Sequence, residues 1–152
     1  MKADIKNESH RVSIGVYKPM IQRIQKAACD YYGVDVKVSQ QHTRKDESMR
    51  VRQVIHYLCR ELYPNCFLHI IGTLTGNGRP FDHSTVINSH RVISNDLNSR
   101  TAKGNITYPE LHAAIKEIRL LISSRSSNRK NRIRMHYRLM FKRSRKFSFV
   151  TK

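Results

Sequence analysis

The chain has 152 residues, with 29 Lys and Arg against 11 Asp and Glu, and a formal net charge of +18. This length suits one domain with an extension, and no run approaches the ~18 apolar residues of a membrane span. A chain this cationic is expected to bind a polyanion. RNA or an anionic membrane surface stays open for its basic C-terminal residues, although no membrane partner is expected. Three cysteines without a CxxC pair favour reduced thiols and a cytoplasmic setting, and the first residues do not resemble a secretory signal.

The positive charge is concentrated at the C-terminal end. Residues 1–124 carry 18 basic and 11 acidic side chains, whereas residues 125–152 carry 11 basic and no acidic ones. We therefore predict an N-terminal arm at 1–18, a folded domain at 19–123 and a basic tail at 124–152 that interleaves cations with aromatics. The tail cations expected to bind nucleic acid without sequence preference are Arg129, Lys130, Arg132, Arg134, Arg138, Lys142, Arg143, Arg145 and Lys146.

The first predicted helix begins near Pro19, because proline is tolerated in a first helical turn. Apolar residues then recur at three- and four-residue steps from Met20 to Tyr31, and Gly33 provides a C-terminal stop. Residues 34–48 are predicted to be a connecting segment with an exposed basic loop at Arg44 and Lys45.

Residues 49–62, MRVRQVIHYLCREL, show the clearest helical period in the chain, and Pro64 ends it. A short apolar helix is predicted at about 65–75, followed by the turn TGNGRPF. Asp82 then offers an N-cap for a helix with one apolar face, formed by Val86, His90, Ile93 and Leu97. The capping-box pattern at 107–110 opens a last helix.

These elements predict an all-α fold containing a helix-turn-helix. In that motif the second helix enters the major groove of DNA and presents its first residues to base edges. Here those residues are Asp82, His83, Ser84 and Thr85. A carboxylate accepts from a cytosine amino group, a histidine donates to a purine acceptor, and small hydroxyls bond bases or contact a thymine methyl.

Several motifs in order resemble the C-terminal DNA-binding domain of the bacterial replication initiator DnaA, a Trp-repressor-like helix-turn-helix. They are YYGV with the basic segment after it, VRQVIHYLCREL, IIG and DHSTVINSHRVI, within about residues 19–97. The resemblance implies that the DHST residues, Asp82 to Thr85, read the major groove. The sequence has no GxxxxGK[ST] motif, so an ATPase domain of that type is not expected here.

The resemblance also implies contacts to the DNA backbone or minor groove. The Arg-Gln pair of the family maps onto Arg52 and Gln53, and the basic-loop arginine onto Arg44 or Lys45. Asp46 stands where the family often has that arginine, and the Gly-Gly-Arg before DHST is lengthened to TGNGRPF, so Arg79 is a possible replacement. The full predicted set is Arg44, Lys45, Arg52, Gln53, Arg60, Arg79 and Arg91.

Other chemistries have weaker support in the sequence. His56, Cys59, Cys66 and His69 have the ligand types for zinc, but buried structural cysteines are the favoured interpretation. His90 lies on an apolar stripe and is expected to be a core histidine. No catalytic pair or triad emerges, so we expect neither an enzyme nor a metal or cofactor.

Two functions therefore stay open at the sequence level. The favoured one is sequence-specific binding of double-stranded DNA in replication control or transcriptional regulation, in the bacterial nucleoid or from a phage-encoded protein. The alternative is nonspecific packaging of nucleic acid or a virion-associated structural role, with the tail dominating. Further partners among replication, transcription or virion proteins are compatible with either, and the sequence does not fix the oligomeric state.

Overall fold

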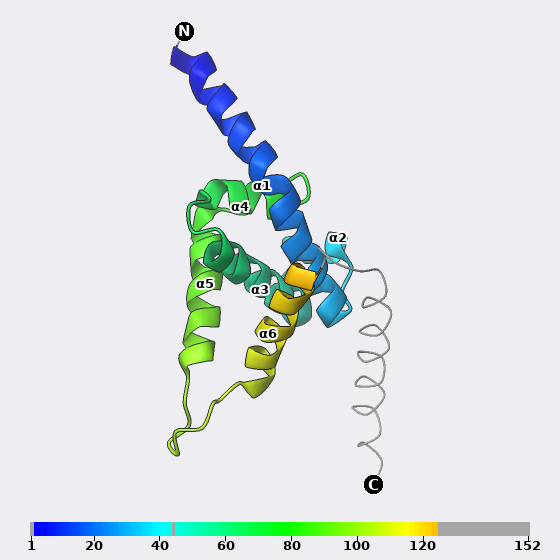
Figure 1. Ribbon diagram of the computed structural model, residues 1–152, viewed down its shortest axis with the longest axis vertical. Coiled ribbons are helices and arrows are strands. Elements are labelled where there is room, and N and C mark those ends of the chain that lie inside the picture. Colours follow the sequence, from blue (N-terminus) through cyan, green and yellow to red (C-terminus); the bar gives the residue numbers. More distant parts are fainter. Residues whose placement is uncertain (1, 44, 125–152) are drawn as a thin grey trace.

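The computed structural model describes residues 2–43 and 45–124, and its regular elements over these residues are all helices (Figure 1). They are α1 (Lys2–Tyr32), α2 (Val36–Ser39), α3 (Asp46–Leu62), α4 (Leu68–Thr75), α5 (His83–Asn98) and α6 (Pro109–Ser124). The loop between α5 and α6 adds one isolated antiparallel bridge, between Arg100 and Ile106. The all-α prediction is confirmed for the described residues. The predicted tail lies outside them except for Ser124, the last residue of α6.

Helix α1 corrects the prediction for the N-terminal region. It begins at Lys2, so residues 2–18 are helical, and Pro19 lies inside the helix and not in its first turn. A proline in a helix interior removes one hydrogen bond and costs about 3 kcal/mol. Packing on both sides of Pro19 offsets this cost, because Ile14 and Tyr17 contact the core before it and Ile21 is fully buried after it. Figure 1 shows the first turns of α1 extending beyond the helices packed on it.

Helix α1 ends as the sequence predicts. Gly33 adopts a φ of 68°, a left-handed conformation that glycine accepts without penalty. The turn lets Val34 N donate to Cys29 O at 3.0 Å, which satisfies a carbonyl of the last helical turn. The segment after it contains the short helix α2, capped by Asp35, whose Oδ1 accepts from Lys37 N at 2.7 Å. Sequence periodicity missed α2 because four residues hold barely one turn.

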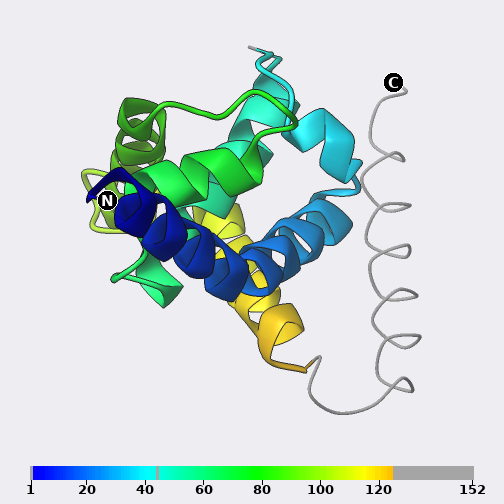
Figure 2. The ribbon, with the colours of Figure 1, turned by 90° about the horizontal axis from the view of Figure 1, so that it is seen from above.

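Helix α3 lies at the centre of the domain, between α1 and α5 (Figure 2). Its predicted apolar stripe is buried, including Val51, Val54 and Leu58, which are fully inaccessible. The apolar faces of α1, α4, α5 and α6 contribute to the same core. Met20 is an exception to the predicted α1 stripe, since 37% of it is exposed.

The three cysteines are buried, free thiols. Burial raises the pKa of Cys29, of Cys59 and, to about 11, of Cys66. They are therefore neutral at physiological pH and serve as small apolar core residues.

A buried histidine joins helices α3, α4 and α5. His56 of α3 is 0% exposed; its Nε2 lies 3.0 Å from Thr75 Oγ1 of α4, and its Nδ1 lies 3.1 Å from Ser89 Oγ of α5. The Thr75 hydroxyl donates its only proton to Ile71 O at 2.7 Å. It must therefore accept from His56 Nε2–H, and the Ser89 hydroxyl donates to Nδ1. His56 is thus a neutral imidazole with every polar atom bonded.

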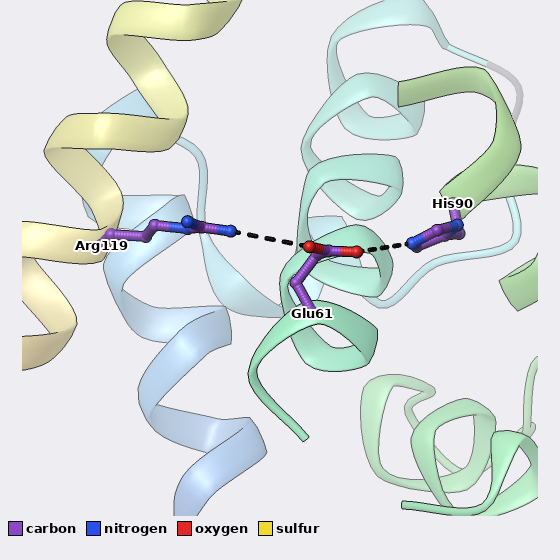
Figure 3. Close-up of polar contacts among 3 residues, drawn as sticks. All are labelled: Glu61, His90 and Arg119. Carbon is purple, nitrogen blue, oxygen red and sulfur yellow. Dashed lines mark hydrogen bonds and ion pairs between the residues drawn. The ribbon is translucent and has the colours of Figure 1, made fainter. Parts of the chain in front are cut away.

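A second polar bridge holds the middle of α5. Glu61, in the last turn of α3, lies between two helices in Figure 3. Its Oε1 accepts from His90 Nε2 of α5 at 3.0 Å, and its Oε2 lies 3.9 Å from Arg119 Nη2 of α6. The His90 ring also stacks on Tyr57 of α3, with ring centroids 5.3 Å apart. The expectation of a core histidine at position 90 is wrong: His90 is half-buried at the edge of the core, and its Nε2 is bonded to Glu61.

The turn of the helix-turn-helix approaches α4 very closely. Phe81 N donates to Gly72 O at 3.0 Å, and a Cβ placed on Gly72 would lie 2.1 Å from Phe81 O. Only glycine leaves room for this approach. Because Phe81 directly precedes the cap of α5, this contact sets where α5 begins.

We expect the free energy of unfolding to fall as the pH drops from about 6.5 toward 3 because of His56. Burial, with a smaller effect from the Arg52 charge, lowers the pKa of His56 to about 3, while a histidine in the unfolded chain titrates near ~6.5. Between these two values only the unfolded chain binds the proton, so the free energy of unfolding falls by about 1.4 kcal/mol for each pH unit lowered. Above pH ~6.5 the contribution of His56 is fully present. Urea denaturation between pH 7 and pH 4 measures this, and a His56→Gln variant lacks this part of the slope. An NMR titration in which folded His56 becomes protonated near pH ~6.5 would contradict the prediction.

We expect Gly72→Ala to lower the free energy of unfolding by about 1–3 kcal/mol, because its methyl group displaces the Phe81 backbone. Gly15→Ala is the matched control, since a Cβ there meets no atom within 4 Å and alanine favours a helix by about 0.5–1 kcal/mol. Urea denaturation of both variants at pH 7 gives the comparison. Equal stability of the two would show that the close approach at Gly72 is relaxed in solution.

Candidate nucleic-acid interface

The first turn of α5 is capped and exposed. Asp82 is the N-cap residue, and its Oδ1 accepts from Ser84 N at 2.8 Å. Hydrogen bonds from the Ser84 backbone and side chain hold the pKa of Asp82 below its usual value, so the carboxylate stays charged. His83 Nδ1 lies 2.9 Å from the same oxygen, and the His83 and Asp82 side chains are 67% and 63% exposed. The cap therefore also orients His83, with Nε2 as the ring atom left for a base.

A polar groove separates the first two turns of α5 from the start of α3. Met49, Arg52 and Gln53 line its α3 side, and Ser84, Thr85, Asn88 and Ser89 line its α5 side. The fold thus brings the predicted Arg-Gln pair of α3 beside two of the predicted base-reading residues. Ser89 also bonds His56, so the floor of this groove is fixed to the core.

Arg52 is engaged within the protein. It is 9% exposed, and its Nη1 and Nη2 donate to Gln41 O and Thr43 O, the latter at 3.0 Å. Its guanidinium also lies over the Phe81 ring, with Cζ 4.8 Å from the centroid. Arg52 therefore ties the segment before α3 to the turn before α5.

Phe81 is the centre of this arrangement, which the sequence did not reveal. His42 stacks on the Phe81 ring with centroids 4.2 Å apart, and His42 Nε2 lies 3.0 Å from Arg79 O. The His56 ring meets the Phe81 ring edge-on, with ring centroids 5.6 Å apart. One signal was available in the sequence. Phe81 directly precedes the N-cap Asp82, and Val86 lies four residues after that cap, which is the spacing of a hydrophobic staple. Both side chains are buried.

The other predicted cations are distributed around this centre. Lys45 is exposed and directly precedes α3, with its backbone N 3.2 Å from Thr43 Oγ1. Arg79 is exposed in the turn before α5, and Arg91 is exposed on α5, where its Nη2 donates to Asn88 Oδ1 at 2.9 Å. Arg60 is half-buried in the last turn of α3, beyond the residues that line the groove. Arg44 and the tail cations from Arg129 to Lys146 lie outside the described residues.

Asp46 occupies a helical position and not the loop. It is the first residue of α3, and it and Glu47 place negative charge in the first turn. An acid there interacts favourably with the positive end of the helix dipole. Asp46 therefore has a local structural role at the start of α3.

The described residues offer no support for a metal site or a membrane span. Among them, no group of three or more His, Cys, Asp or Glu side chains is arranged to hold a metal ion. The disfavoured zinc alternative at His56, Cys59, Cys66 and His69 is therefore not supported. No helix in the described part of the chain combines the length and apolarity needed to cross a bilayer.

Comparison with known protein families identifies the domain. Residues 21–93 match the family described as the bacterial DnaA protein helix-turn-helix, from the middle of α1 through most of α5. No curated protein and no solved structure matches the chain. The matched segment contains the capped first turn of α5, the groove beside it and the His56 bridge. Residues 21–93 of this chain therefore form a helix-turn-helix domain similar to that of the bacterial DnaA protein.

Proposed function

We propose that this protein binds double-stranded DNA at a specific sequence resembling a DnaA box and acts in replication control or transcriptional regulation. The observation that carries the proposal is the contrast within α5. Its first turn exposes Asp82, His83 and Ser84, whereas the following turns are held to α3 through Ser89 and His90. Exposed polar groups on a rigid helix start are what reading base edges requires.

In the proposed complex the N-terminus of α5 enters the major groove. Asp82, His83, Ser84 and Thr85 face base edges, and Gln53 lies across the groove from them. Lys45, Arg79 and Arg91 are exposed cations around this end and take the phosphate or minor-groove contacts that fix the register. Arg60 contributes at the far end of α3.

Arg52 has a positioning role in this proposal. Two of its N–H groups already serve the carbonyls of Gln41 and Thr43. Its charge still adds to the positive potential of the groove, while its hydrogen bonds set the path of the basic loop. A single helix-turn-helix of this kind suits one asymmetric site bound by one copy of the chain, without a palindrome.

We expect His83→Ala to lower affinity for the selected site about tenfold or more and to leave affinity for random DNA nearly unchanged, because a base contact carries sequence information. The selected site comes from enrichment of randomised duplexes with the full chain at near-physiological salt. Lys116→Ala on α6 is the control, since it removes an exposed charge outside the groove. Equal loss on selected and random DNA in His83→Ala would mean that this helix does not read bases.

We expect removal of residues 125–152 to weaken binding by a similar factor on every sequence and to flatten its dependence on salt. The eleven cations of this segment have no acidic neighbours in the sequence, and each phosphate contact releases counterions. Titrations at several salt concentrations, on selected and random duplexes, give both quantities. Loss of the selected motif itself on truncation would instead support packaging by charge.

A further inference from the structure

Asn88 is an exposed polar residue of α5 to which the family resemblance assigns no role. It lies one turn after Ser84, on the same face of the helix, and lines the groove opposite Gln53. Its position extends the row of polar side chains beyond the first turn. If the proposed docking of α5 holds, Asn88 lies where a second base along the groove is read.

The neighbouring arginine fixes how the Asn88 amide is turned. Arg91 Nη2 lies 2.9 Å from Asn88 Oδ1, and a guanidinium can only donate. The amide oxygen must therefore face Arg91, which leaves the two N–H groups of Asn88 Nδ2 for other partners. The spacing of three residues on one helix makes this pair a local feature that does not need the DNA to form.

The resulting surface presents hydrogen-bond donors. Asn88 contributes its amino group, and Arg91 contributes the guanidinium N–H groups that Asn88 does not use. Among base edges in the major groove, guanine alone offers two acceptors, N7 and O6, and no donor. A free asparagine instead pairs with adenine, because its oxygen accepts from the adenine amino group while its nitrogen donates to N7.

We propose that Asn88, with its amide oriented by Arg91, is a specificity-determining residue that selects guanine at one position of the bound site. This inference rests on the proposed function. It adds one base contact to those expected from Asp82 to Thr85, and it gives Arg91 a positioning role besides any phosphate contact.

The test compares the motifs enriched from randomised duplexes by the full-length wild type and its variants. Asn88→Ala should reduce the guanine preference at one position about tenfold and leave the rest of the motif intact. Arg91→Ala should change that position from guanine to adenine, because the freed amide oxygen can then accept from the adenine amino group. An arginine that only contacts phosphate would lower affinity evenly and leave the motif unchanged.

Asn95→Ala is the matched control, since Asn95 is an exposed asparagine on the same helix outside the groove. It should leave the motif as in the wild type. Helical circular dichroism of each variant verifies that α5 remains folded. A wild-type motif that survives Asn88→Ala and Arg91→Ala unchanged overturns this inference alone, whereas the absence of any wild-type motif overturns the proposed function with it.

Discussion

The arrangement of the DNA-binding motif depends on one neutral imidazole. His56 accepts from Ser89 on one side and donates to Thr75 on the other, so a single ring holds α4 and α5 at fixed positions on α3. Leaving either nitrogen without a partner in this buried site would cost about 1–3 kcal/mol. The bridge therefore specifies one arrangement of the helices, where apolar packing alone would tolerate several.

The turn before α5 departs from the compact family pattern, and the structure shows what fills the added length. Phe81 packs inward, with its backbone on Gly72 and its ring among His42, Arg52 and His56. The longer turn is therefore packed against the domain through Phe81, and we call this packed residue the Phe81 wedge. It joins the segment before α3 to the first residue of α5. Arg52 connects the two, because its guanidinium lies over the Phe81 ring and donates to the Gln41 and Thr43 carbonyls.

The sequence predicted correctly those features that depend on neighbouring residues, namely helix positions and the helix cap. The 3.6-residue period located α3, α5 and α6, and Asp82 is the cap that its side chain predicts. The sequence did not predict those features that depend on contacts between residues distant in the chain. Pro19 lies within a helix because tertiary contacts hold both sides of it, and Arg52 is engaged by carbonyls nine and eleven residues away. The candidate site followed from the resemblance, but the contacts around Phe81 and the Asn88–Arg91 pair are visible only in the folded structure.

If the proposed docking holds, the packing of Phe81 also limits which DNA sites the protein binds. In the proposed docking, Lys45 and the start of α5 meet adjacent grooves, and Phe81 joins the two segments through its contacts with His42 and Arg52. Each base pair adds about 3.4 Å of rise and about 34° of rotation to a duplex, which a rigid reader cannot follow by stretching. A protein docked in this way would depend on the spacing of its two contacts as well as on the bases, and would bind weakly to a site whose two parts have the right sequence at the wrong separation.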